Sequence, residues 1–434
     1  EEAMTADQVV WSEQGRLHLS YTATVVGVGD TNGTIAITAD IDGDTTVGST
    51  TSRTHAVRVN DTVLIAQAGV VVKALVVETP DSNVVSVEPY AAATLTAAGL
   101  SDASATVLVI GSEYGKGQSY SDVTGTHNSD RREAIEPTFK HFDNKPIIMK
   151  DYYEVSGSDA SQVGWVEVSG EEGQSGYMWY LKAEGDTRAR FTDYLEMSMI
   201  EAEKTVANSA IGFANKQIRG AADSGAGGSG TEGLFAAIEA RGNLTSGVTG
   251  VNAATDLAEF DAILAEFDSQ GAIEENMMFV NRATSLAMDD MLASMNSYGA
   301  GGTSYGVFNN SEDMALNLGF SGFRRGSYDF YKSDMRYLND KATRGGINTA
   351  AGSAAIRGVM IPAGTSTVYD QALGKNLKRP FLHVRYRASQ TDNRKFKTWV
   401  TGSVGAATSA LDAMQIHMLS ERCLVTQGAN NFML

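Results

Sequence analysis

The sequence contains little cysteine and no long apolar run, and each scarcity excludes a class of structure. A single cysteine, Cys423, among 434 residues excludes an internal disulfide framework and any multi-cysteine zinc or iron–sulfur site. We expect Cys423 to be a small apolar residue in a C-terminal strand. Because no stretch of eighteen apolar residues occurs, we expect no membrane-spanning helix and no membrane partner.

Positive charge is also scarce. The chain has 34 Lys and Arg against 52 Asp and Glu, a formal net charge of −18. This balance argues against a reader of nucleic acid, which needs a clustered positive surface. It is compatible with a protein that lies beside DNA without binding it tightly. The hydrophobic content of 42% and the length indicate a folded protein of two or three packed units.

The sequence begins EEAMTADQ, without an initiator methionine. This start indicates either proteolytic removal of an upstream piece or trimming of the expressed sequence. No charged n-region and apolar h-region of a secretory signal is present in it.

The first third of the chain predicts a small β-domain followed by a polar arm. From Tyr21 to Ile110, short apolar runs such as GTIAITAD and GVVVKALVVET alternate with Gly, Asn and Asp, which is typical of antiparallel strands and turns. The polar, glycine-dotted segment Gly111–Lys140 comes next. A long segment of this kind usually closes over a ligand or reaches a neighbouring molecule.

A well-patterned strand follows the arm. In HFDNKPIIMKDYYEVSG (His141–Gly157) apolar and polar residues alternate, and Trp165–Gly173 supplies a second short strand. The two strands predict a long two-stranded ribbon. Such a ribbon is marginally stable alone and needs another surface to lie on.

The pattern then changes to that of helices. Apolar residues at three- and four-residue spacing predict a long amphipathic helix over Asp186–Gln217, ended by the glycine-rich segment Arg219–Gly233. Asp256 and Glu259 predict the N-terminus of a second helix, which Gly271 ends. A short buried strand, a further helix and a series of C-terminal strands complete the chain.

Two glycine motifs resemble catalytic or nucleotide-binding signatures but lack their context. Gly225–Gly230 (GAGGSG) fits the dinucleotide fingerprint, yet a helix rather than a strand precedes it, and Thr231 stands where a phosphate-binding loop needs lysine. Gly302–Gly306 (GTSYG) fits the serine-hydrolase elbow, but Ser304 follows the end of a helix instead of a strand. We interpret both as flexible loops.

Metal-ligand patterns are equally weak. Asp40–Asp44 (DIDGD) spaces carboxylates as a calcium loop does, but Thr45 replaces the required glycine and Thr51 the bidentate glutamate. A turn with solvated acids is the favoured interpretation. The six histidines show no i, i+4 ligand pair, and they are His18, His55, His127, His141, His383 and His417. We therefore predict no catalytic, metal or cofactor-binding residue and no enzyme.

Charge is unevenly distributed along the chain. Acidic residues dominate from Asp151 to Glu203, and basic residues gather later, at Arg324, Arg325, Lys332, Arg336, Lys341, Arg344, Lys375, Lys378, Arg379, Arg385, Arg387, Arg394, Lys395 and Lys397. These could be ordinary solvated faces. We favour the hypothesis that an acidic surface of one subunit meets a basic surface of the next, which would set the register between subunits.

The order of these parts resembles a known family. The strand DNKPIIMKDYYEVSG, the acidic helix RARFTDYLEMSMIEAEK, the segment GTEGLFAAI and the ending HMLSERCLVTQGANNFML are similar to major capsid proteins of tailed double-stranded-DNA bacteriophages with the HK97-like fold. The resemblance covers about Gly111 to Leu434. Lys145 and Pro146 depart from it, because related sequences tend to have a polar pair there.

The resemblance implies an α+β fold with an extended loop, a long spine helix, and peripheral and axial domains, to which a β-rich domain is added. The implied divisions are an N-terminal arm (1–20), the β-rich domain (21–110), an extended loop formed by a two-stranded ribbon (111–173), a peripheral domain with the spine helix (174–219), an axial domain (220–350) and C-terminal strands completing both domains (351–434). N-terminal cleavage during maturation is common in the family and would suit a chain that begins at Glu1.

The implied function is structural. Copies would assemble as hexamers and pentamers into an icosahedral shell in the host cytoplasm and would reside in the virion. Portal and decoration proteins would be partners, and packaged DNA would lie close without specific binding. The alternative from a different class is a secreted or cell-surface β-rich protein that forms arrays or adheres, since abundant Thr, Val and Gly with an acidic surface suit it equally.

Overall fold

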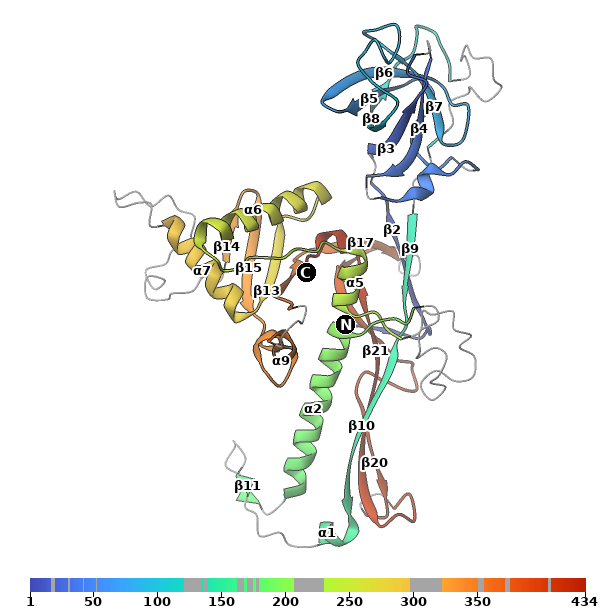
Figure 1. The fold of residues 1–434 in the computed structure, drawn as a ribbon. Helices are drawn as coiled ribbons and strands as arrows, with labels where there is room; N and C mark the ends of the chain where they lie inside the picture. Colours follow the sequence, from blue (N-terminus) through green and yellow to red (C-terminus); the bar gives the residue numbers. More distant parts are fainter. Residues whose placement is uncertain are drawn as a thin grey trace. The chain divides into compact units, whose positions relative to one another are not determined.

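The structure is a computed structural model that describes residues 1–16, 20–29, 32–41, 43–51, 53–120, 134–135, 139–161, 168–169, 175–176, 179–206, 230–296, 322–349, 355–370, 375–404 and 407–434. The chain forms two compact units, Glu1–Trp11 with His141–Leu434, and Ser12–Lys140. Helices and mainly antiparallel sheets both occur (Figure 1), which agrees with the α+β class predicted from the sequence. None of the helices in these ranges is long and apolar enough to cross a membrane.

The unit of residues 12–140 contains a closed β-barrel with antiparallel neighbours in the order β3-β4-β7-β6-β5-β8. Its strands are β3 (Ser20–Val26), β4 (Gly33–Asp40), β5 (Asp61–Gln67), β6 (Val70–Glu78), β7 (Val84–Pro89) and β8 (Ser104–Ser112), and a short 3-10 helix, η1 (Thr45–Gly48), follows β4. Closure pairs every strand on both sides, so the barrel presents no free edge to another chain.

Alternation along each strand fills the barrel with small β-branched and aliphatic side chains. On β3, Tyr21, Ala23 and Val25 are buried inside, while Thr22 and Val26 face outward. Gly33 lies at a point where no side chain fits, because a Cβ there would come within 2.2 Å of Leu95. The barrel core therefore depends on the period-2 pattern that the sequence already displays.

The β5–β6 hairpin closes through two residues. Gln67 pairs with Val70, and the turn residues Ala68 and Gly69 have φ angles of 45° and 85°. Two successive left-handed residues are the geometry that matches the twist of the flanking strands. Gly69 adopts it without strain, whereas Ala68 adopts a conformation that is unfavourable for a residue with a side chain.

The other unit contains two larger sheets. The first has the order β1 (Glu2–Met4), β19 (Leu382–Arg387), β21 (Ala413–Thr426) and β10 (Ile147–Ser156), and β20 (Lys397–Gly402) also pairs with β21. The second has the order β14 (Gly322–Arg325), β15 (Tyr328–Asp334), β13 (Glu275–Val280) and β16 (Gly358–Pro362). In the first sheet β21 is the central strand, because it pairs with β10 on one side and with β19 and β20 on the other.

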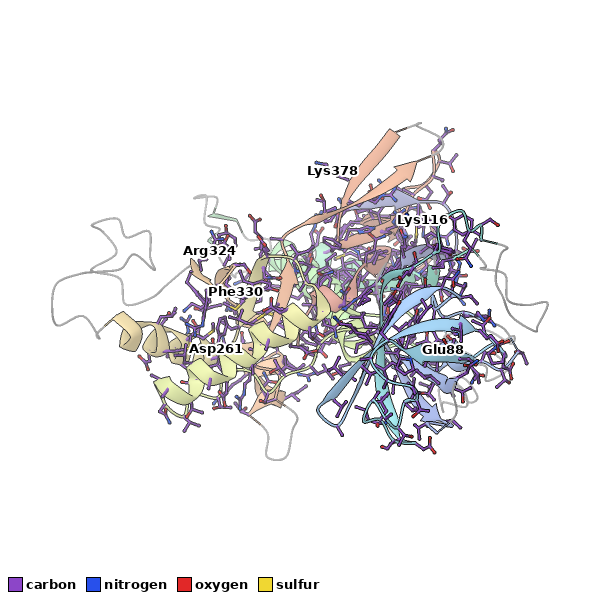
Figure 2. The ribbon with its side chains drawn as sticks, turned by 90° about the horizontal axis from the view of Figure 1, so that it is seen from above. Glu88, Lys116, Asp261, Arg324, Phe330 and Lys378 are labelled. Carbon is purple, nitrogen blue, oxygen red and sulfur yellow. The ribbon has the colours of Figure 1, made fainter. Side chains whose placement is uncertain are left out.

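Helices α6 (Ala253–Gln270) and α7 (Arg282–Asn296) pack on the second sheet. Phe260 of α6 meets the rings of Phe323 and Phe330 at centroid distances of 5.5 and 5.2 Å. Figure 2 labels Phe330 of this cluster and Asp261 on α6, and Asp261 forms an ion pair with Arg325 of β14 at 2.6 Å. The cluster and the ion pair together hold α6 on the sheet.

The remaining elements are the long helix α2, several short helices and three two-stranded sheets. The helices are α1 (Gly157–Ser161), α2 (Trp179–Glu201), α5 (Leu234–Arg241), α8 (Arg336–Asn339), α9 (Arg344–Asn348) and the 3-10 turn η3 (Ala429–Asn431). Three two-stranded sheets pair β2 (Val9–Gln14) with β9 (Phe139–Asn144), β11 (Val168–Ser169) with β12 (Ser175–Gly176), and β17 (Thr365–Asp370) with β18 (Lys375–Pro380). The pairing of β2 with β9 means that the barrel is inserted in the chain between two paired strands.

The ribbon prediction is wrong in its partner strand. The sequence predicts that the strand within His141–Gly157 pairs with Trp165–Gly173, but β10 pairs along all ten of its residues with β21. Within 165–173, the described residues Val168–Ser169 pair with β12 instead. The reason lies in the partner surface, since β21 offers buried Ile416 and Met418 to β10, whereas the local segment carries acidic residues.

The bounds of two predicted helices also differ. Helix α2 ends at Glu201 rather than extending to Gln217. The carbonyl of the next residue, Ala202, accepts a hydrogen bond from the backbone N–H of Gly233 at 2.7 Å, so it bonds to the segment before α5 instead of continuing the helix. Residues 207–217 lie outside the described residues. Helix α6 begins at Ala253 with Asn252 as its N-cap, earlier than predicted, and its predicted end at Gly271 is confirmed.

Replacing Ile65 by Ala should destabilise the barrel by about 2–5 kcal/mol, because Ile65 is completely buried among packed side chains that cannot fill the cavity. Amide hydrogen exchange of β5 and β6 in the full chain measures the change. Ile110→Ala is the matched control, since Ile110 lies on the barrel exterior and is 49% exposed. Equal effects of the two substitutions would show that the barrel interior is not packed as described.

Candidate functional site

A buried asparagine joins three distant parts of the chain. Asn144, only 1% exposed, is the last residue of β9, three residues before β10 begins at Ile147. Its Nδ2 donates to the carbonyls of Glu232 at 3.0 Å and Leu424 at 2.6 Å. Its Oδ1 accepts from the backbone N–H groups of Lys145 at 2.9 Å and Glu232 at 2.8 Å and from the Thr231 hydroxyl at 3.3 Å. We call these five bonds the Asn144 network.

An aromatic and cationic cluster lies beside the network. The rings of Trp11 on β2 and Phe142 on β9 are 6.1 Å apart. The guanidinium of Arg241 lies 4.6 Å from the Phe142 ring and 5.8 Å from the Trp11 ring, and it forms an ion pair with Glu232 at 2.6 Å. Cation–π contacts of this kind hold Arg241 of α5 against Trp11 and Phe142.

The N-terminal strand lies against a row of arginines. Strand β1 pairs in parallel with β19, and Glu2 forms ion pairs with Arg385 and Arg379 at 2.9 Å each. The Glu1 carboxylate pairs with Lys395, whose hydrogen bond is the main cause that lowers the pKa of Glu1. The first residues of the chain thus neutralise bases that come from near its C-terminus.

The charge-based interface hypothesis stays a prediction, although the chain pairs many of these charges internally. Most of the basic residues that the hypothesis assigned to a neighbouring subunit have acidic partners within the same chain: Arg324, Arg325, Lys332, Arg336, Arg344, Arg379, Arg385, Arg387, Arg394, Lys395 and Lys397. The acidic residue Glu201 pairs with Arg344 at 2.8 Å. These pairs therefore stabilise the fold of the subunit itself.

Strands β10, β21 and β20 form a three-stranded extension of the first sheet, which we call the arm sheet. Helix α2 runs along one of its faces (Figure 1). Phe191 and Leu195 of α2 are buried against Met418 of β21, and Arg190 pairs with Asp151 of β10 at 2.8 Å. This face is a small core made from α2, β10, β21 and Phe396, the residue before β20.

The opposite face of the arm sheet carries a row of rings. Tyr152, His417 and Trp399 occupy matching positions on β10, β21 and β20. His417 stacks on Tyr152 at 6.0 Å and on Trp399 at 5.2 Å, and its Nε2 lies 2.7 Å from the Thr401 hydroxyl. Tyr152 remains 56% exposed. Aromatic side chains left uncovered on a sheet face often mark an interaction surface.

His383, which the sequence places in an apolar strand, is 7% exposed. Burial lowers its pKa, and its ring nitrogens lie 3.1 Å from the Pro380 carbonyl and 3.4 Å from Arg385 Nε. It lines a cavity of about 480 Å³ with Glu1, Glu2, Glu196, Arg422 and several apolar residues. Glu1 and Glu2 are held in the ion pairs described above. The carboxylates that line this cavity at the N-terminus are therefore already engaged by bases of the same chain.

The remaining predicted positions divide into two groups. Cys423 is buried in β21, as predicted, and burial raises the pKa of its thiol to about 11. The motif Gly302–Gly306 lies outside the described residues, as does Gly225–Gly230 except for Gly230. No group of three or more His, Cys, Asp or Glu suited to a metal ion occurs among the residues that the structure describes.

In segment 40–44, whose carboxylate spacing resembles that of a calcium loop, the described residues form a turn. The backbone N–H of Asp44 donates to Asp40 Oδ1 at 2.8 Å, and the Asp44 carboxylate caps η1 by accepting from the N–H of Thr46 at 2.9 Å. Asp44 also pairs with Lys140 at 3.1 Å. Asp42 lies outside the described residues.

No family model and no curated protein match the sequence. Solved structures similar to the chain come from phages. They include Mycobacterium phage Ogopogo (12% identity, 71% of this chain and 81% of that chain, TM-score 0.37), Gordonia phage Cozz (10%, 88% and 83%, 0.37) and the asymmetric unit of the bacteriophage PhiM1 mature capsid (10%, 72% and 77%, 0.33). At such identities and TM-scores we draw no structural argument from them.

Sequence reasoning missed the Asn144 network and the ring row. The sequence pointed to Asn144 only through the family resemblance. The three rings could not be grouped, because they are separated by up to 265 positions in the sequence, as the pairing of residues 152 and 417 shows. The alternation along β10 did place Tyr152 on the polar face, which was the one available signal.

Replacing Asn144 by Ala should destabilise the unit by about 3 kcal/mol or more, because it leaves buried backbone groups of Glu232 and Leu424 without partners. Chemical denaturation of the full chain measures this loss. Lys145→Ala is the adjacent control and should change little, since its side chain is exposed. A neutral effect at Asn144 would contradict the network.

We predict that the contribution of Asp44 to the stability of the barrel depends on pH in the acidic range. Hydrogen bonds from the Thr46 hydroxyl and backbone, with Lys140 nearby, lower the pKa of Asp44 from 3.8 to about 2. A lowered pKa means that the stabilisation is complete above about pH 4 and is lost as the pH falls towards about 2. The difference in barrel stability between wild type and Asp44→Asn should therefore shrink over this interval. A constant difference from pH 5 to 2 would rule out this role.

Proposed function

We propose that the chain is the structural subunit of an icosahedral shell of a tailed phage, which encloses double-stranded DNA, and that it performs no catalysis. The observation that carries the proposal is the form of the arm sheet. A ten-residue strand spans about 33 Å, yet among the described residues a single helix, α2, covers one face of this sheet. A sheet of this kind gains stability when a neighbouring copy covers it, which a closed shell supplies to every subunit.

The order of elements supports the HK97-like arrangement. In this proposal β2 and β9 are the two strands of the extended loop, α2 is the spine helix, and the arm sheet with α2 is the peripheral domain. The sheet β14-β15-β13-β16 with α6 and α7 is the axial domain. The barrel, Ser20–Ser112, is then an additional domain inserted within the extended loop, rather than one that precedes it.

The charge of the chain fits a container for DNA. A net charge of −18 reduces tight binding of packaged phosphate, so the DNA stays free to be packed and released. The in-chain pairing of the C-terminal bases acts in the same direction, because Arg379 and Arg385, engaged by Glu2, and Lys395, engaged by Glu1, are less available to phosphate. Portal and decoration proteins are the further partners that this role requires.

Sedimentation combined with negative-stain imaging tests the proposal. We expect the native material to sediment as closed, angular particles of megadalton mass. Flat arrays or fibres would instead support the array-forming alternative. A monodisperse monomer or dimer from the native source would refute the shell function.

A further inference from the structure

The uncovered face of the arm sheet has a charge pattern that is reversed across its ring row. One step along the strands, on the side toward Ile148, lie Lys150, Leu419 and Lys397. One step in the other direction lie Glu154, Gln415 and Thr401. Two lysines therefore lie on one side of the aromatic row of Tyr152, His417 and Trp399, and one carboxylate, Glu154, lies on the other.

Both flanking rows are ordered by contacts within the chain. Gln415 Nε2 donates to Glu154 Oε2 at 2.6 Å, and the Thr401 hydroxyl donates to Gln415 Oε1 at 3.2 Å. The side chains of Lys150 and Glu154 are both exposed. Lys397 is already paired with Asp392 at 2.8 Å, so Lys150 is the base of this face with which an incoming acidic group can pair.

We propose that this face is a docking surface for the same face of a second copy of the chain, related by a two-fold axis parallel to the ring row. Rotation about that axis reverses the strand direction and keeps each residue on its own strand line. Each ring then meets its own counterpart, and Lys150 of each copy meets Glu154 of the other. The contact is isologous, since one patch serves both sides.

The charge pattern selects this axis over the other possible one. A two-fold axis parallel to the strands would exchange β10 with β20 and bring Lys150 against Lys397, which Asp392 already pairs, and Glu154 against Thr401. No complementary charge pair would form across that contact. The first axis instead forms two Lys150–Glu154 pairs around a central aromatic contact, which is the arrangement of an apolar centre with a polar rim.

The contact is small, and this fits its place in an assembly. The ten residue pairs of β10 with β21 and the six residues of β20, on strands about 4.8 Å apart, present roughly 400 Å² per copy. This is about half of what a stable pair of proteins buries on each side. The face is therefore a weak contact in dilute subunits and becomes effective when other contacts hold copies together. In this respect the inference rests on the proposed self-assembly.

A cysteine cross-link tests the geometry in the full chain. Tyr152→Cys places one exposed thiol on the axis, and the native Cys423 is buried and unreactive. Under mild oxidation we expect a disulfide-linked dimer from Tyr152→Cys at high protein concentration. Val400→Cys is the control, because Val400 is 39% exposed on β20 and faces the opposite side of the sheet. Equal cross-linking of the two variants, or none from Tyr152→Cys, would overturn the inference.

A charge exchange tests the two-fold relation itself. In the Tyr152→Cys background, Lys150→Glu alone and Glu154→Lys alone should each slow dimer formation about tenfold, because each creates two like-charge pairs. The two single variants mixed together should form mixed dimers at nearly the parent rate, since each heterologous pair is again complementary. The double variant Lys150→Glu with Glu154→Lys should also recover. Failure of the mixture and the double variant to recover would refute the two-fold contact.

The outcomes separate this inference from the proposed function. Shells that form while Tyr152→Cys gives no cross-link within them would reject the docking surface and retain the shell function. Cross-linked dimers from a protein that forms no megadalton particle would reject the shell function and retain the docking surface.

Discussion

The Asn144 network is the constraint on which the arrangement of the larger unit depends. The side-chain amide of Asn144 forms hydrogen bonds with backbone groups of Glu232, in the segment before α5, and of Leu424 in β21. Asn144 itself ends β9, shortly before β10 begins. Because all of these groups are buried, each needs a partner inside the protein. The network therefore fixes the start of β10 relative to β21, and with it the register of the ten residue pairs that make the arm sheet.

Strand β21 extends this constraint through the unit. Its first half lies between β10 and β20, and its second half lies beside β19, which in turn pairs with the N-terminal strand β1. Nearly all of its contacts are with residues far away in the sequence. Contacts of long sequence separation are costly in chain entropy until many form together. The arm sheet thus requires the C-terminal strand before β10 has a partner.

Charge has two separate roles in this chain. The arginines of β19 and the following loop are engaged by Glu1, Glu2 and Glu421, so they stabilise the fold and hold the N-terminus against it. The charges on the uncovered face of the arm sheet, Lys150 and Glu154, are exposed and few. A small number of exposed charges can specify an orientation between copies even when they add little affinity.

The sequence by itself determined the local features. Alternation predicted the strands of the barrel and of β10, Gly271 predicted the end of α6, and the apolar setting of Cys423 predicted its burial, because periodicity and turn chemistry depend only on neighbouring residues. Tertiary structure alone decided the partner of β10, the end of α2 at Glu201, the pairing of the C-terminal bases with Glu1 and Glu2, and the Asn144 network. Each of these joins segments that are distant in the sequence, and the choice depends on which buried polar group or apolar face is available in space. No local pattern encodes that availability.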